Sequence, residues 1–146
     1  MAVETLTKPS LTLKRHIKAP PAEVFAAWTD PQKIVRWMGP GDYQGEHAEI
    51  EARVGGRFHW QMKRPDGEQL EVNGIFREVV ANEKLVFSWA WKGTPERESL
   101  VTVLLKPDGA GTQLTLMHAQ FFDDEARAGH EKGWTGSLDK LEMFFS

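Results

Sequence analysis

The chain has 146 residues, a formal net charge of −3 and no cysteine. Its 40% hydrophobic and 27% charged content is typical of one globular domain. The lack of cysteine excludes thiol catalysis, disulfides and cysteine-ligated zinc, and the negative charge argues against a nucleic-acid partner. Because no signal peptide and no long apolar run is visible, we expect a cytoplasmic protein without a membrane partner.

The N-terminal third predicts one strand and two short helices. After a leader at residues 1–10, residues 11–18 alternate apolar and polar side chains, as a half-buried strand does, although Arg15 interrupts the apolar side. Residues 19–30 predict a short helix with proline in its first turn. The Asp-Pro pair at 30 and 31 predicts a second helix over residues 30–38. The glycine-rich loop "GPGDYQG" at 39–45 then ends that helix.

Alternation of apolar and polar residues continues from there almost to residue 120. It predicts further strands over residues 47–54, 57–63, 70–77, 84–91, 99–106 and 112–119. In the first of these, Ala52 and Val54 fall on the inward side, whereas residues 99–106 are apolar on both sides and cannot be oriented. Short spacers favour antiparallel pairing over parallel crossovers.

The C-terminal stretch "HEKGWTGSLDKLEMFF" predicts an amphipathic helix over residues 130–145. Its apolar stripe consists of Trp134, Leu138, Leu141 and Phe145. Gly133 and Gly136 each cost about 1 kcal/mol relative to alanine in a helix interior. Tertiary packing must therefore stabilise this helix, and one interpretation is that the glycines leave clearance for Trp134.

One helix cannot cover such a sheet if the sheet is flat. A helix is about 10–12 Å across, whereas seven strands span roughly 30 Å. We therefore expect a curved sheet wrapped around the helix, with bends at Gly45, at Gly55–Gly56 and at Gly74. Curvature of this kind leaves space between helix and sheet, which predicts a lined pocket with the 39–45 loop at its rim.

Five segments in order resemble those of a known family. They are "APPAEVFAAWTDPQKIVRWMGP", "VGGRFHWQMKRPDG", "GIFREVVANEKLVFSWAW", "TVLLKPDGAGTQLTLMHAQF" and "HEKGWTGSLDKLE". They are similar to the activator of heat-shock protein 90 ATPase homologue-like family, within the START-like (SRPBCC) superfamily of birch-pollen-allergen-like proteins. The resemblance covers residues 11–146 as a single domain. It implies an α+β helix-grip fold: a curved seven-stranded antiparallel sheet around a long C-terminal helix, with two short helices after the first strand.

The resemblance and the inward residues together predict a domain that binds a small apolar or aromatic molecule. We expect the pocket to be lined by Trp37, Trp60, Met62, Phe76, Phe87, Trp89, His118, Trp134 and Leu138. Indole N–H groups buried in such a pocket need acceptors, which a ligand with a polar tip would supply.

His118 is the main polar candidate, since alternation places it on the inward face. One interpretation is a polar anchor or an acid–base group, which would suit an enzyme of the polyketide cyclase or aromatase kind. The favoured interpretation is a core histidine with a satisfied hydrogen bond. His130 and Ser137 are expected near it. A third hypothesis, taken from the resemblance, is a co-chaperone-like interaction module with a chaperone partner and a role in stress response.

The other candidates have ordinary alternatives. Arg15 either binds a carboxylated ligand or extends its charge to the sheet edge, and Tyr43 either reaches a ligand or caps its loop. The histidines lack metal-ligand spacing, so neither a metal nor another cofactor is expected. Met143, opposite the apolar stripe, is a weak indication of a homodimer, which leaves monomer and homodimer both open.

Overall fold

The computed structural model describes residues 8–146, so residues 1–7 of the expected leader lie outside the described part. Seven strands form one sheet in the order β1-β7-β6-β5-β4-β3-β2, and every neighbouring pair is antiparallel, as predicted. Their bounds are β1 Leu11–Ile17, β2 Gln44–Ile50, β3 Arg57–Lys63, β4 Gln69–Val80, β5 Lys84–Trp91, β6 Ser99–Asp108 and β7 Gly111–Ala119.

Three helices accompany the sheet: α1 Pro21–Thr29, α2 Pro31–Ile34 and α3 Asp124–Phe144. The predicted second helix extends four residues too far at its C-terminal end, since α2 ends at Ile34. Trp37 and Met38, which follow it, are nevertheless buried. The predicted terminal helix is too short. The observed helix α3 begins earlier, at Asp124. The Asp123 carboxylate accepts a hydrogen bond from the Ala126 N–H and caps the first turn of α3. None of the helices in residues 8–146 is long and apolar enough to cross a membrane.

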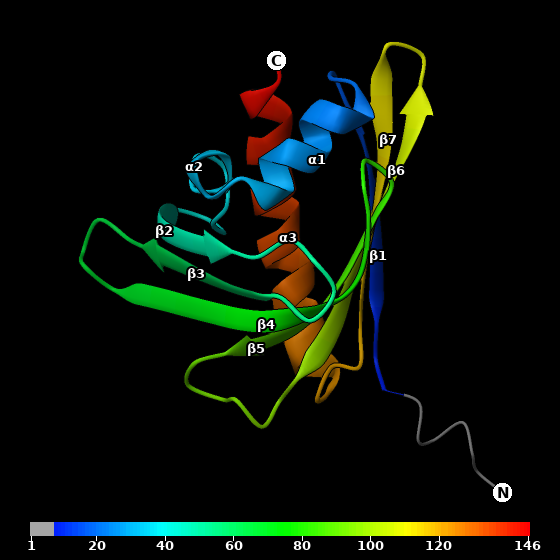
Figure 1. The fold of residues 1–146 in the computed structure, drawn as a ribbon. Coiled ribbons are helices and arrows are strands. Elements are labelled where there is room, and N and C mark those ends of the chain that lie inside the picture. The colour runs from blue at the N-terminus through cyan, green and yellow to red at the C-terminus, as the bar shows by residue number, and fades with distance from the viewer. Residues whose placement is uncertain (1–7) are drawn as a thin grey trace, which may run out of the picture.

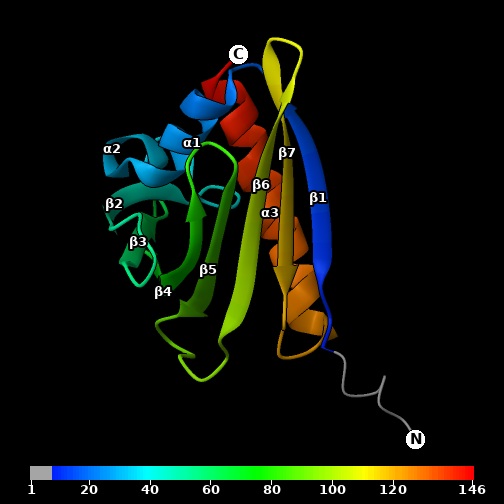
Figure 2. The ribbon, with the colours of Figure 1, turned by 45° about the vertical axis from the view of Figure 1, so that its right-hand side comes forward.

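The sheet curls around α3, which crosses its concave side (Figure 1). Turned by 45°, the view shows α3 lying behind β6 and β7, with α1 and α2 near its C-terminal end (Figure 2). Trp134, Leu138 and Leu141 of α3 are buried against this concave face, as the predicted stripe requires. Phe145, the last member of that stripe, lies beyond the helix and is only partly buried.

Curvature arises at strand irregularities. The register of β2 against β3 shifts next to Gly45, and that of β4 against β5 shifts after Phe76. A Cβ at Gly74 would lie 1.9 Å from the Ser88 carbonyl oxygen, so only glycine allows β4 and β5 to approach so closely there.

The prediction for the end of β2 is wrong. Ala52 is exposed and Val54 is 66% exposed, because the strand ends at Ile50 and the chain enters a turn. Gly55 has a φ of +82° in that turn, and a Cβ at Gly56 would lie 2.0 Å from the Glu51 carbonyl oxygen. The glycine pair therefore makes a connection between strands rather than a bend within one.

Arg15 fixes the edge strand β1 to α3. Its Nη1 donates to Asp139 Oδ1 and to Glu142 Oε2, each at 2.6 Å. The Arg15 pKa is raised by these hydrogen bonds and charges in spite of desolvation, which opposes the rise. The guanidinium is thus held by carboxylates of the protein itself.

Candidate functional site

A cavity of about 720 Å³ lies between α3, the segment from residue 38 to 43, and the ends of β3, β4 and β5. The lining residues are Met38, Pro40, Gly41, Asp42, Tyr43, Met62, Arg64, Leu70, Trp89, Trp91, Ala126, Gly129, His130, Lys132, Gly133, Trp134, Thr135, Gly136, Ser137 and Asp139. Exposed residues such as Asp42 and Lys132 are among them, so the cavity opens to solvent on that side.

On the helix side of the pocket, small residues lie between larger lining side chains such as His130, Lys132 and Trp134. Ala126, Gly129, Gly133 and Gly136 recur at intervals of three and four, which places them on one face of α3. Gly133 and Gly136 face the loop from residue 39 to 43. The atoms nearest to a Cβ at these positions belong to Pro40 and Gly41. These glycines therefore shape the pocket as well as the surroundings of Trp134.

The loop from residue 39 to 43 is attached to α3 by hydrogen bonds. Lys140 Nζ donates to the carbonyl oxygens of Gly39 and Tyr43 at 2.7 and 2.8 Å. The Gly39 N–H donates to Ser137 Oγ at 3.4 Å. Burial lowers the pKa of Lys140. Charge-assisted bonds to two carbonyls hold this side of the pocket in place.

Charged residues form the rim. The Arg64 guanidinium lies over the Tyr43 ring, 5.3 Å from its centroid, and its Nε lies 3.3 Å from Asp42 Oδ1. A hydrogen bond with Tyr43, followed by the charge of Asp42, raises the Arg64 pKa. Tyr43 is thereby fixed at the rim, and its ring contributes to the lining.

The sheet side of the pocket is apolar and aromatic. Met62 of β3, Leu70 of β4 and both Trp89 and Trp91 of β5 form it. Trp89 is 4% exposed, and its indole N–H has no hydrogen-bond partner among residues 8–146. A buried indole N–H without an acceptor is costly. Trp28 and Trp60, which do not line the cavity, have the same unpartnered N–H within the described part of the chain.

His118 lies in the core directly behind this wall. The Trp134 indole N–H donates to His118 Nδ1 at 3.0 Å, which makes Nε2 the protonated nitrogen. That nitrogen donates to Ser99 Oγ at 2.7 Å, and the Ser99 hydroxyl donates to the Trp89 carbonyl at 3.3 Å. Desolvation, and then the charge of His130, lower the His118 pKa to about 2. Its two nitrogens are both engaged, so the geometry supports a structural histidine rather than an acid–base group.

His130 comes close to His118, as predicted, with 5.1 Å between ring centroids. Its Nδ1–H donates to the Ala126 carbonyl at 2.7 Å, and its Nε2 accepts from the Trp91 indole at 2.9 Å. Desolvation lowers its pKa. The Trp91–His130 bond joins β5 to the first part of α3 at one end of the pocket.

The predicted lining set divides between pocket and core. Met62, Trp89 and Trp134 line the cavity. His118 does not line it, but accepts a hydrogen bond from the lining residue Trp134. The remaining predicted residues are core side chains outside the lining: Trp37, Trp60, Phe76, Phe87 and Leu138. Among them, Trp37 donates its indole N–H to the Ala27 carbonyl at 3.0 Å, so this buried N–H has an acceptor within the protein.

Several lining residues were absent from that set. Alternation places Leu70 and Trp91 on the inward side of their strands, close to the strand ends. The sequence does not show that the cavity lies at those ends. The helix glycines had a signal, since glycine at spacing three and four on an amphipathic helix needs a tertiary explanation. The rim position of the glycine-rich loop was predicted and is confirmed.

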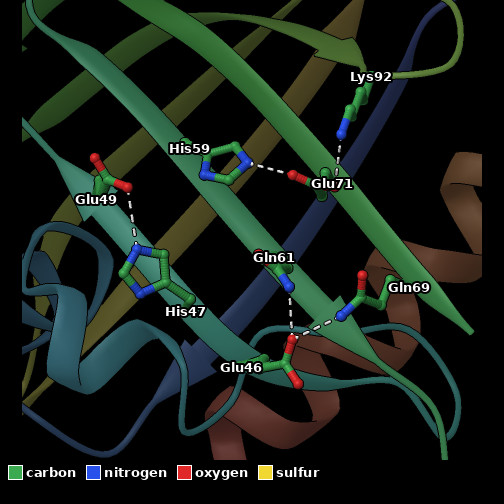
Figure 3. Close-up of polar contacts among 8 residues, drawn as sticks. All are labelled: Glu46, His47, Glu49, His59, Gln61, Gln69, Glu71 and Lys92. Carbon is green, nitrogen blue, oxygen red and sulfur yellow. Dashed lines mark hydrogen bonds and ion pairs between the residues drawn. The ribbon is translucent and has the colours of Figure 1, made fainter. Parts of the chain in front are cut away.

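Two of the histidines lie on the convex side of the sheet, away from the cavity. His47 and His59 lie on the outer face of β2 and β3 and contact Glu49 and Glu71 at 3.1 and 2.9 Å (Figure 3). Hydrogen bonds from His59 and then Lys92 lower the Glu71 pKa. In residues 8–146, no group of three or more His, Asp or Glu side chains is arranged to hold a metal ion.

Comparison with solved structures finds the same fold in bacterial proteins. A crystal structure of a Chromobacterium violaceum protein is 24% identical, with a TM-score of 0.84 over 93% of this chain and 96% of that one. The AHSA1 protein of Silicibacter pomeroyi is 30% identical, with a TM-score of 0.82 over 92% of this chain and 96% of that one. A solution structure of an Arthrobacter aurescens protein is 24% identical, with a TM-score of 0.83 over 93% and 85% of the two chains. No curated protein sequence matches this chain.

A family model described as "Activator of Hsp90 ATPase homolog 1-like protein" matches residues 18–146. This span contains both short helices, the six strands from β2 to β7 and α3 with its glycine face. The helix-grip fold and the match together support a ligand-binding domain in general terms. By this match and this fold, the chain belongs to the activator of Hsp90 ATPase homolog 1-like family.

Proposed function

We propose that this protein binds a small, neutral, apolar or aromatic molecule in the cavity between α3 and the sheet. The observation that carries the proposal is a cavity of about 720 Å³ with Met62, Leu70, Trp89 and Trp91 on its sheet side. Pockets of a few hundred cubic ångströms with apolar walls and few polar groups are the usual sites for small ligands.

Electrostatics favour a neutral ligand. The rim cation Arg64 is already engaged by Asp42 at 3.3 Å and by Glu68 at 3.1 Å. The sheet side of the pocket, formed by Met62, Leu70, Trp89 and Trp91, carries no charged group. A fully charged group would lose its hydration beside the indoles without gaining a partner there.

Binding would proceed without a catalytic step by His118. Its nitrogens are engaged by Trp134 and Ser99, and a pKa of about 2 keeps the imidazole neutral at physiological pH. A chaperone partner stays a prediction.

The test is a titration of intrinsic tryptophan fluorescence and of heat with neutral aromatics of graded size. We expect saturable quenching, because Trp89, Trp91 and Trp134 line the cavity. Leu70→Lys should weaken binding by placing a charge in the wall. Val80→Lys changes a 42% exposed apolar residue of the same strand outside the lining and should bind as the unchanged protein does. A flat response across the panel, or equal binding by both variants, would refute the proposal.

A further inference from the structure

The deepest lining residues of the cavity are closed off from solvent. Met38, Met62, Trp89 and Trp134 all line it, yet each is only 1–4% exposed. At that exposure even water scarcely contacts these side chains. A ligand the size of an aromatic ring can therefore lie against them only after part of the cavity wall has moved.

The walls differ in how they are held. β3, β4 and β5 each pair with a neighbouring strand on both sides, and α3 is a continuous helix of 21 residues. The loop at 39–43 belongs to neither a helix nor a strand. Within residues 8–146, its backbone-to-backbone hydrogen bond runs from the Tyr43 N–H to the Pro40 carbonyl at 3.0 Å and stays inside the loop. The Gly39 N–H donates to the Ser137 side chain. This loop is therefore the wall that can move as a unit without breaking a strand ladder.

A side chain of α3 holds the loop closed. Lys140 Nζ donates to the Gly39 and Tyr43 carbonyls, so it binds both ends of the loop. On the sheet side, the loop is held by the ion pair of Asp42 with Arg64, whose side chains are 61% and 37% exposed. Exposed pairs of this kind hold weakly. The charge-assisted bonds of Lys140 are thus the main attachment that opening of the loop would break.

We propose that residues 39–43 form a lid and that Lys140 is its latch, so that the lid opens to admit the ligand and closes over it. This inference rests on the proposed function and adds how the same site is entered. Gly39 and Gly41 have φ values of +142° and +58°, which glycine adopts at little cost. A Cβ at Gly41 would meet no atom within 4 Å, so the outer side of the lid is open space.

A disulfide between the lid and α3 tests the proposal. A Cβ at Gly133 would lie 3.4 Å from the Pro40 Cβ, close to the separation that a disulfide spans. Because the chain has no cysteine, Pro40→Cys combined with Gly133→Cys can form a single bridge. The probe is N-phenyl-1-naphthylamine, a neutral aromatic compound whose fluorescence rises in an apolar site, followed by stopped flow. We expect the oxidised protein to bind and release it at least about tenfold more slowly than the same protein reduced with dithiothreitol.

Oxidation with the probe already bound should trap it. The probe should then stay with the protein through gel filtration until dithiothreitol is added, whereas a pocket merely distorted by the bridge would release it.

Removal of the latch should have the opposite effect on exchange. Lys140→Met should speed both association and dissociation by about tenfold, because the bonds that favour the closed lid are lost. The Kd should change less than either rate. Lys14→Met is the control: it removes an exposed lysine of β1 outside the lining and should exchange the probe as the unchanged protein does.

Three results would overturn the lid and leave the proposed function standing: equal exchange rates in the oxidised and reduced protein, loss of the trapped probe during gel filtration, or equal rates in Lys140→Met and Lys14→Met. Failure of the two cysteines to form a disulfide would also overturn it, because the loop would then not rest on α3. Failure of the unchanged protein to bind the probe would overturn both inferences.

Discussion

Replacing His118 by glutamine tests whether this residue is a buried, neutral part of the core. At neutral pH the substitution removes the acceptor of the Trp134 N–H and the donor to Ser99. One glutamine amide cannot reproduce both ends of the imidazole geometry, so at least one buried polar group loses its partner. Each such loss costs about 1–3 kcal/mol, and we expect the free energy of unfolding to fall by about 2–4 kcal/mol at pH 7.5.

The pH dependence gives a sharper signature. The His118 pKa lies at about 2 in the folded protein, against 6.5 for an ordinary histidine. Between these values the unfolded chain binds a proton that the folded chain does not, so the stability of the unchanged protein decreases as pH falls below 6.5. Each pH unit in that range costs about 1.36 kcal/mol, so at pH 4.5 the loss from this one residue is about 2.7 kcal/mol. His118→Gln has no such proton, and its deficit should therefore shrink by about that amount.

The assay is urea unfolding followed by circular dichroism at pH 7.5, 6.5, 5.5 and 4.5. Since His130 is present in both proteins, its own titration largely cancels in the difference. His47→Gln is the control for loss of an imidazole, because this side chain is 54% exposed on the outer face. It should change stability by less than about 0.5 kcal/mol. A deficit of His118→Gln that stays constant from pH 7.5 to 4.5 would refute the buried neutral assignment.

Two further substitutions test the fold. Trp134→Ala should lower the free energy of unfolding by about 3–5 kcal/mol in urea, because a 3% exposed indole and its bond to His118 are lost; unchanged stability would contradict the placement of α3. Gly74→Ala should lower Tm, with a loss of about 1–3 kcal/mol or more, because its Cβ meets the Ser88 carbonyl. Gly93→Ala is the control, since a Cβ there would meet no atom within 4 Å, and an equal Tm for the two variants would contradict the close approach of β4 and β5.

The predictable part of the site followed from strand alternation. Met62 and Trp89 have apolar neighbours at spacing two, and such spacing places side chains on one face whatever the rest of the fold does. The same spacing predicted His118 inward, and it is fully buried. Alternation failed at Val54, because a turn with a positive φ at Gly55 ended β2 before that residue.

Which inward residues reach the cavity was not predictable from alternation. Trp60 and Trp89 share the concave face, and their rings lie 5.6 Å apart, yet only Trp89 lines the pocket. The difference depends on how far α3 stands from each strand, and no local pattern encodes that distance. The attachment of residues 39–43 by Lys140 likewise joins positions about a hundred residues apart.

By itself, the sequence determined the family, the seven antiparallel strands and the apolar stripe of α3, because periodicity and turn chemistry are local properties. It also contained the glycines of α3, but not their neighbours. Only the tertiary structure decided that those glycines face a cavity, that Arg15 is held by Asp139 and Glu142, and that His118 is engaged on both nitrogens. These are contacts between distant segments, and they depend on the curvature of the sheet around one helix.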